Sequence, residues 1–169
     1  TTAAAVYRLY ESIFARLPDW RALAQVTGTE LQALVGVLGL GQQRVGRLKA
    51  LAEWVSEHHW KLPQTRTELE DIPGIGQYVA GALLAVKYGK PEPMLDVNMA
   101  RVLERYFGER ELADIRDDPW LQTLSRLACP GAELGWAVLD FGAAVCRTAR
   151  PRCRECVLWS GCKRNFMTN

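Results

Sequence analysis

The sequence has no long apolar run, and no charge of one sign dominates it. No stretch approaches the roughly 20 consecutive apolar residues that a membrane-spanning helix needs, so we expect no membrane partner. The 21 Lys and Arg residues nearly balance the 19 Asp and Glu residues, which leaves a formal net charge of +2. This mild basic excess is compatible with a nucleic-acid partner but is no argument for one. There is also no β-type alternation and no repeat.

Cysteine is scarce along most of the chain and concentrated at one end. There are five cysteines, four of them between residues 146 and 162, and Cys129 stands apart. Nothing in the sequence points to secretion, so a reducing compartment is expected. In such a compartment clustered cysteines are more often metal ligands than disulfides. Cys129 is expected to be a small buried apolar residue.

The apolar residues that are present recur at helical spacing. Leu9, Ile13 and Leu17 lie on one face of a first helix, which Pro18 ends, and Thr29 is a candidate cap for the next. About half of the chain is apolar, enough for the core of one domain or two small lobes. The pattern predicts an all-α protein with helices over residues 3–17, 29–38, 42–59, 67–71, 76–88, 97–107, 118–128 and 132–145.

The four clustered cysteines follow the spacing Cys146-x6-Cys153-x2-Cys156-x5-Cys162. Four thiolates complete the protein ligand set of an iron–sulfur cubane. Structural zinc sites usually pair their ligands as two close-spaced knuckles, whereas here one CxxC stands between two single cysteines. The spacing therefore favours a cubane over zinc or unligated thiols. The surrounding arginines and lysines could face a phosphate backbone or offset the charge of the thiolates.

A Pro-Gly-Ile-Gly turn, residues 73–76, lies between two predicted helices. Gly74 and Gly76 allow a positive φ and a close approach to a ligand, and the free N–H groups that begin the following helix suit a phosphate. The turn could also simply connect two helices.

Two polar residues near this turn are candidates for chemistry. Tyr78 follows Gly76 by two residues, and Asp96 precedes a predicted helix. Asp is a favoured N-cap, so Asp96 could serve only the helix.

Taken together, the turn, the Leu95-Asp96 pair 18 residues beyond Tyr78 and the cysteine tail resemble the endonuclease III and adenine mismatch glycosylase superfamily of helix-hairpin-helix DNA glycosylases. The resemblance covers essentially the whole chain. It implies two helical lobes with a DNA cleft between them: a helical barrel lobe with the hairpin over residues 1–91, and an iron–sulfur cluster lobe over residues 92–169. It further implies that Cys146, Cys153, Cys156 and Cys162 hold a [4Fe-4S] cluster.

The resemblance also implies roles for individual residues. Asp96 would be the catalytic carboxylate, which stabilises or attacks the oxocarbenium-like sugar of a flipped-out nucleotide. The hairpin would grip a DNA phosphate, often with a bound monovalent cation, through Pro73, Gly74, Ile75, Gly76 and Gln77. Leu40 resembles a residue that wedges into the gap left by the flipped base. Gln42 and Gln43 would contact the orphaned base, although this loop could also be an ordinary connection between helices.

Tyr78 decides between two kinds of enzyme in this superfamily. Bifunctional members have a lysine at this position, whose amine forms a Schiff base with the sugar. A tyrosine cannot do so, and the chain therefore looks like a monofunctional glycosylase. Thr1-Thr2-Ala3, Tyr78 and the Asp140-Phe141-Gly142-Ala143 stretch resemble the thymine-DNA mismatch glycosylases, which remove thymine or uracil opposite guanine. The alternatives are an adenine glycosylase acting opposite 8-oxoguanine and a non-catalytic DNA-binding or damage-sensing module.

The remaining expectations concern the whole chain. Family members continue before the position of Thr1 with a helix that packs on the cluster lobe and helps to form the base pocket. That segment is missing from this sequence. We expect a monomer that acts on double-stranded DNA with a mismatched or damaged base, in the cytoplasm of a prokaryote and associated with its nucleoid.

Overall fold

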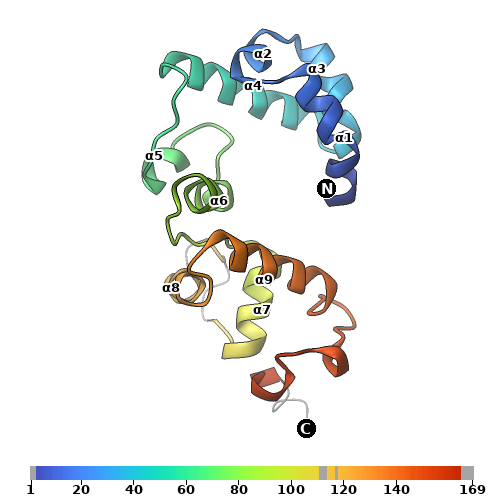
Figure 1. Cartoon of the computed structure of the whole chain (residues 1–169), viewed down its shortest axis with the longest axis vertical. Coiled ribbons are helices and arrows are strands. Elements are labelled where there is room, and N and C mark those ends of the chain that lie inside the picture. The colour runs from blue at the N-terminus through green and yellow to red at the C-terminus, as the bar shows by residue number, and fades with distance from the viewer. Residues whose placement is uncertain (1–2, 111–113, 117, 165–169) are drawn as a thin grey trace. The chain divides into compact units, whose positions relative to one another are not determined.

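A computed structural model of the chain describes residues 3–110, 114–116 and 118–164. Every regular element assigned in these residues is a helix, which confirms the all-α prediction (Figure 1). None of the helices in the described part of the chain is long and apolar enough to span a membrane. Thr1 and Thr2, on which part of the family resemblance depends, lie outside the described residues.

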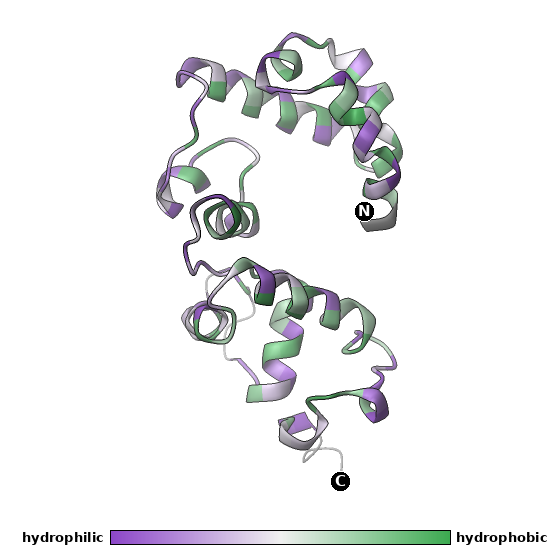
Figure 2. Cartoon of the chain, in the orientation of Figure 1, coloured by the Kyte–Doolittle hydropathy of each residue, from purple (hydrophilic) through white to green (hydrophobic). Residues whose placement is uncertain are grey.

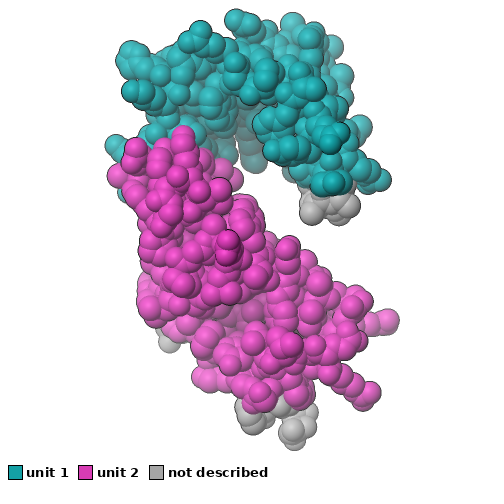
Figure 3. All heavy atoms as spheres, in the orientation of Figure 1, with its two compact units in different colours: residues 1–63, 67–75 teal, residues 64–66, 76–169 magenta. Residues whose placement is uncertain are grey.

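The contacts divide the chain into two compact units (Figure 3). Unit 1 comprises residues 1–63 and 67–75, and unit 2 comprises residues 64–66 and 76–169. The family resemblance predicts a boundary at residue 91. The difference arises because α6, Gln77–Tyr88, packs with α9, Ala132–Ala144, in unit 2. The chain passes from one unit to the other inside the Pro-Gly-Ile-Gly turn.

Unit 1 is a small helical assembly around α4. Buried apolar side chains of α2 and α3, among them Leu23, Leu31 and Val35, share its core with Ala52 of α4. Lys49 of α4 donates hydrogen bonds to the main-chain oxygens of Ala24 and Val26, at the end of α2. Its helices are α1 (Ala3–Arg16), α2 (Trp20–Gln25), α3 (Gly28–Val35), the 3-10 helix η1 (Gly36–Leu38), α4 (Gly41–Glu57) and α5 (Arg66–Glu70), the last beginning with Arg66 of unit 2.

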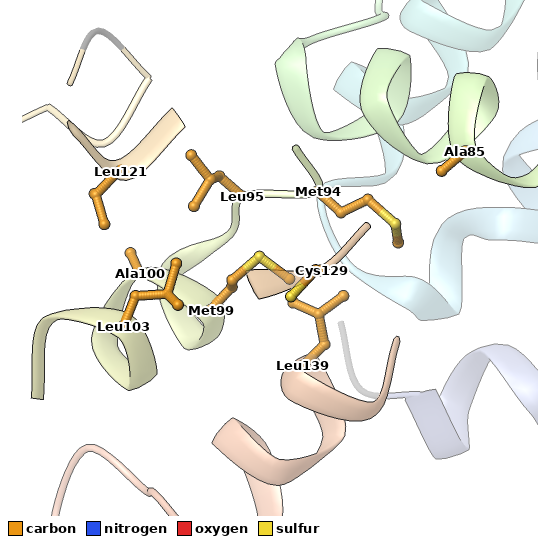
Figure 4. Packing of buried hydrophobic residues seen from close by; sticks show 9 residues of the cluster. All are labelled: Ala85, Met94, Leu95, Met99, Ala100, Leu103, Leu121, Cys129 and Leu139. Carbon is orange, nitrogen blue, oxygen red and sulfur yellow. The ribbon is translucent and has the colours of Figure 1, made fainter. Parts of the chain in front are cut away.

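Unit 2 has its own apolar core (Figure 4). The side chains of Met99, Cys129 and Leu139 belong to one buried cluster, and Cys129 is only 4% exposed, which confirms its apolar role. Beside α6 and α9, the unit contains α7 (Val97–Phe107), α8 (Pro119–Ala128) and two short 3-10 helices of the cysteine loop, η2 (Cys153–Glu155) and η3 (Trp159–Gly161).

Two local predictions need correction. The short helix α2 was not predicted, although Asp19 caps it by accepting a hydrogen bond from the Ala22 N–H. Thr29 does not cap α3. Thr27 caps it, because its hydroxyl accepts a hydrogen bond from the Glu30 N–H while the Glu30 carboxylate accepts one from the Thr27 N–H in a capping box.

Hydrophilic and hydrophobic residues are mixed along the helices of the chain, as Figure 2 shows.

Candidate active site

Asp96 stands at the N-terminus of α7 and caps it. Its Oδ1 accepts hydrogen bonds from the N–H groups of Asn98 and Met99, both at 2.8 Å, and its Oδ2 accepts from the Asn98 side-chain amide at 2.9 Å. These bonds hold the carboxylate in one orientation. Asp118, the cap of α8, is only 2% exposed, whereas Asp96 is half-buried and borders a cavity.

This cavity brings Asp96 and Tyr78 together in unit 2. Burial raises the pKa of the Tyr78 phenol above its ordinary value, and the neighbouring Asp96 and Asp140 carboxylates raise it further. The phenol is therefore neutral near pH 7 and able to donate a hydrogen bond. The lining residues are Gly76, Gln77, Tyr78, Val79, Leu95, Asp96, Val97, Ile115 and Arg116.

Arg116 adds a positive charge to the lining of the cavity. Its guanidinium Nε lies 2.9 Å and 3.0 Å from the two carboxylate oxygens of Asp114. This pairing lowers the pKa of Asp114 to about 2. Both side chains are thus charged at neutral pH, and the cavity presents the Asp96 carboxyl group, a neutral phenol and a paired cation.

The Pro-Gly-Ile-Gly turn has the geometry expected of a hairpin. Gly74 has φ +85°, and a Cβ there would lie 3.3 Å from the Arg47 Cβ, so only glycine fits without strain. The Ile75 N–H donates to the Ile72 oxygen at 3.0 Å. Ile75 is buried, so this bond lies within the protein, while Gly74 and Gly76 on either side of it are exposed.

The α6 helix begins directly after this turn without a side-chain cap. Gly76 is its N-cap and has no side chain with which to satisfy the N–H groups of the first turn. Those N–H groups suit an anion. The side chain of Gln77 is half-buried and is hydrogen-bonded within unit 2 to Arg66, Leu95 and Gln122.

The loop before α4 exposes the predicted wedge. Leu40 is 70% exposed and adopts a left-handed conformation, with φ 51° and ψ 36°. This conformation is costly for a residue with a Cβ, and such strain is typical of functional loops. Gln42 and Gln43 follow in the first turn of α4 and are exposed.

The four clustered cysteines line one cavity at the end of unit 2, together with Arg105 and Trp159. Burial raises the pKa of the Cys156 thiol, a hydrogen bond from the Leu158 main chain lowers it, and the three other thiols around the cavity raise it. Arg105 of α7 donates to the main-chain oxygens of Cys146 and Arg147, and its Nη1 lies 3.5 Å from the Cys146 sulfur. The loop is therefore anchored on α7.

The four thiols surround one cavity, and their chemistry fits the ligand set of a cubane. Among the described residues, no group of three or more His, Cys, Asp or Glu side chains is placed to hold a metal ion directly. In a cubane each thiolate binds a different iron, so the four sulfurs surround the cluster from separate corners. Four thiols around a shared cavity, with a guanidinium beside one of them, match that donor set.

Comparison with known proteins identifies the family. Residues 1–117 match the family model described as HhH-GPD superfamily base excision DNA repair protein. The chain belongs to this superfamily. The matched span includes Leu40, the hairpin, Tyr78 and Asp96, and the cysteine loop follows it.

Individual members of the HhH-GPD superfamily resemble the chain over most of its length. It is 33% identical to the thymine-DNA glycosylase of Aeropyrum pernix over 165 residues, which cover 94% of this chain and 74% of that protein. Identity to the thymine/uracil-DNA glycosylase of Pyrobaculum aerophilum is 34%, over 94% of this chain and 72% of the relative. The solved structure of a thermostable thymine-DNA glycosylase superimposes with a TM-score of 0.87 at 28% identity, covering 99% of this chain and 79% of that one.

The structure brings two sets of the predicted residues together. Tyr78, Asp96, Gly76 and Gln77 line one cavity of unit 2, and the four cysteines line another. The other predicted residues belong to unit 1 and line neither cavity: Leu40, Gln42, Gln43, Pro73, Gly74 and Ile75. Sequence reasoning did not find Asn98, Arg116 or Arg66, because nothing in their spacing marks a polar residue that will meet the site.

Proposed function

We propose that this protein is a monofunctional DNA glycosylase that removes thymine or uracil opposite guanine. The observation that carries the proposal is the cavity that joins the Asp96 carboxylate to the Tyr78 phenol beside the start of α6. Its membership of a base excision DNA repair superfamily supplies the reaction class. The names of its relatives, thymine-DNA and thymine/uracil-DNA glycosylase, support the choice of base.

Asp96 would act on the sugar. Cleavage of the N-glycosidic bond builds positive charge on C1′ and its ring oxygen, and a carboxylate held against that charge lowers the barrier. The three hydrogen bonds to Asp96 keep the carboxylate in place without adding a positive charge beside it. Such preorganised groups need not reorient as the reaction proceeds.

Tyr78 would contact the flipped nucleotide rather than attack it. A phenol has no amine and cannot form a Schiff base, so strand cleavage by β-elimination is not available at this position. Its raised pKa keeps the hydroxyl protonated, as a donor to the base or sugar. The product would be an abasic site on an intact strand.

DNA would contact the hairpin and the loop before α4, as the family resemblance implies. The uncapped start of α6 and the main chain of the hairpin would hold a phosphate, and Leu40 with Gln42 and Gln43 would fill the gap in the helix. The monovalent cation at the hairpin, the monomeric state and the nucleoid association stay predictions of the same proposal.

The cysteine loop would hold a [4Fe-4S] cluster. Cys146, Cys153, Cys156 and Cys162 would supply one thiolate to each iron. When bound, the cluster supplies a redox-capable, strongly cross-linking group, and the chain's own part is to orient the thiolates. Arg105 would offset part of their negative charge.

A glycosylase assay on defined duplexes tests the proposal. Duplexes containing G·T, G·U, A·8-oxoguanine or thymine glycol are incubated with the purified protein and then treated with alkali. We expect alkali-dependent strand breaks at the T of G·T and the U of G·U. Breaks at the adenine opposite 8-oxoguanine would make it an adenine glycosylase. Binding without any base release would make it a damage-sensing module.

A further inference from the structure

Gln77, the first residue of α6, has its side chain bonded within unit 2 on both ends of the amide. Its Oε1 accepts hydrogen bonds from Arg66 Nη2 at 3.1 Å and from Gln122 Nε2 at 2.7 Å. Its Nε2 donates to the main-chain oxygen of Leu95 at 3.2 Å. The side chain therefore links the start of α5, the start of α6, α8 and the segment before α7.

The neighbours of Gln77 leave its amide only one orientation. A glutamine amide can be turned through 180° without changing its shape. A guanidinium can only donate, however, so the amide oxygen must face Arg66 and the amide nitrogen must face Leu95. Arg66 is itself held by Gln122 Oε1 at 2.9 Å and by an ion pair with Glu92 at 3.6 Å.

The Leu95 oxygen belongs to the peptide group that leads into Asp96. Leu95 is 1% exposed, so its side chain fixes one end of this peptide while Gln77 fixes the carbonyl. The Asp96 nitrogen is part of the same planar group. A change in the Gln77 bond therefore turns the plane from which the Asp96 side chain projects.

We propose that Gln77 is a positioning residue for base release, which sets the Asp96 carboxylate through the Leu95–Asp96 peptide, with Arg66 and Gln122 orienting its amide. The inference rests on the proposed catalytic role of Asp96. It assigns the Gln77 side chain to hydrogen bonds within unit 2, while the main-chain N–H of Gln77 stays available to a DNA phosphate at the start of α6.

A positioning role predicts a specific split between rate and affinity. Misplacing a reacting group by about 1 Å can cost on the order of a hundredfold in rate. DNA affinity comes mainly from phosphate contacts, and the Gln77 side chain makes none in this proposal. Loss of the amide should therefore lower the rate of base release while leaving the dissociation constant for DNA nearly unchanged.

The test uses the full-length protein and a neutral substitution, Gln77→Leu, which adds no charge beside the phosphate site. Single-turnover base release is measured on a G·T duplex. The dissociation constant is measured separately on the same duplex with a 2′-fluoro thymidine, whose glycosidic bond resists cleavage. We expect the rate to fall by roughly ten- to a hundredfold and the dissociation constant to change by less than about threefold.

A second variant and a control keep the test informative. Gln122→Glu places a carboxylate against the Gln77 oxygen while preserving a partner for Arg66, so it should disturb the amide and lower the rate in the same way even if Gln77→Leu does not fold. Gln64→Leu changes an exposed glutamine of the same unit and should behave as wild type. Thermal melting verifies that each variant is folded.

Two outcomes would overturn the proposal. One is a folded Gln77→Leu or Gln122→Glu protein that releases the base at the wild-type rate. The other is a loss of DNA affinity with an unchanged rate, which would return the Gln77 side chain to the DNA. Failure of the proposed function looks different, because then the wild-type protein itself releases no base from the G·T duplex.

Discussion

At the scale of single residues, the surroundings of three helix-capping aspartates distinguish Asp96, the proposed catalytic carboxylate, from the other two. Asp19, Asp96 and Asp118 all cap helices by accepting main-chain hydrogen bonds. Asp118 is buried and Asp19 is exposed on the surface, while Asp96 borders a cavity that also contains a phenol. Capping therefore explains why an aspartate stands at position 96, and the cavity explains why its charge can act on a ligand.

Substitution of Leu40 should change the free energy of unfolding and the rate of base release in opposite directions. Leu40→Gly removes a strained left-handed side chain but adds freedom to the unfolded chain, so the free energy of unfolding should rise by roughly 0–1 kcal/mol. The rate of base release from a G·T duplex should nevertheless fall, on the order of tenfold, because the wedge is lost. Chemical denaturation and single-turnover kinetics give the two quantities.

Val37 is the matched control for this change. It lies three residues before Leu40 and is equally exposed, at 72% against 70%, but has a negative φ. Val37→Ala should leave base release unchanged. A Leu40→Gly protein with the wild-type rate would show that this loop is an ordinary connection.

In the proposed mechanism, the phenol of Tyr78 is the reason why the DNA strand is not cut. Tyr78→Lys introduces an amine where bifunctional relatives carry one, and it should add strand cleavage and a DNA adduct that borohydride traps. Wild-type protein should show neither, and its product should break only after alkali. Equal trapping of both proteins would mean that another amine of the chain attacks the sugar, which contradicts the monofunctional assignment.

At the scale of helices, α6 packs closely against the segment before α7 because Gly81 has no side chain. A Cβ on Gly81 would lie 1.9 Å from the Pro93 oxygen, so α6 touches the main chain of the segment that leads to Asp96. Gly81→Ala should therefore lower the free energy of unfolding by about 3 kcal/mol. Gly46→Ala in α4, where a Cβ meets nothing within 4 Å, should raise it by roughly 0.5–1 kcal/mol.

Denaturation curves of the two alanine variants test this packing together. Both changes add one methyl group to a helical glycine, so the intrinsic gain in helix propensity is shared. Opposite signs in the two free energies of unfolding would support the contact between α6 and Pro93. A Gly81→Ala protein as stable as Gly46→Ala would mean that α6 lies further from this segment.

The sequence predicted most helices because their causes are local. Apolar spacing places α7 over residues 97–107, where the structure also has it. The sequence does not predict the six-residue α2, because the helix is too short to show a periodic apolar face. Its N-cap, Asp19, directly follows Pro18, which in the sequence marks only the end of α1. The bond between Gln77 and Gln122 was beyond sequence reasoning, since 45 residues separate partners that only tertiary packing brings together.

At the scale of the whole molecule, two sites of different kinds share unit 2. The cavity of Tyr78 and Asp96 contains the proposed chemistry, and the cysteine cavity the proposed cluster. Motifs of close spacing, the CxxC and the Pro-Gly-Ile-Gly turn, made both predictable. The groups that orient them were not predictable, because Asn98 and Arg105 are ordinary helix residues in the sequence.

The cluster prediction is tested by metal analysis. Protein purified without oxygen should be brown and contain about four irons per chain with little zinc. Cys153→Ala should lose the iron and lower the melting temperature, since metal binding is coupled to folding. Cys129→Ala, which removes a buried core thiol outside the cysteine loop, should retain the iron. Stoichiometric zinc without iron in the wild-type protein would contradict the assignment.

A comparison of wild-type protein with Asp96→Asn tests whether the Asp96 carboxylate is responsible for removal of the base. Single-turnover release of thymine from a G·T duplex is measured for wild type and Asp96→Asn, alongside DNA affinity. Asparagine keeps the size and can still cap α7, but it lacks the negative charge. The account predicts a rate lower by on the order of a hundred- to a thousandfold with equal or tighter DNA binding. An Asp96→Asn protein with full activity would show that Asp96 is only a helix cap.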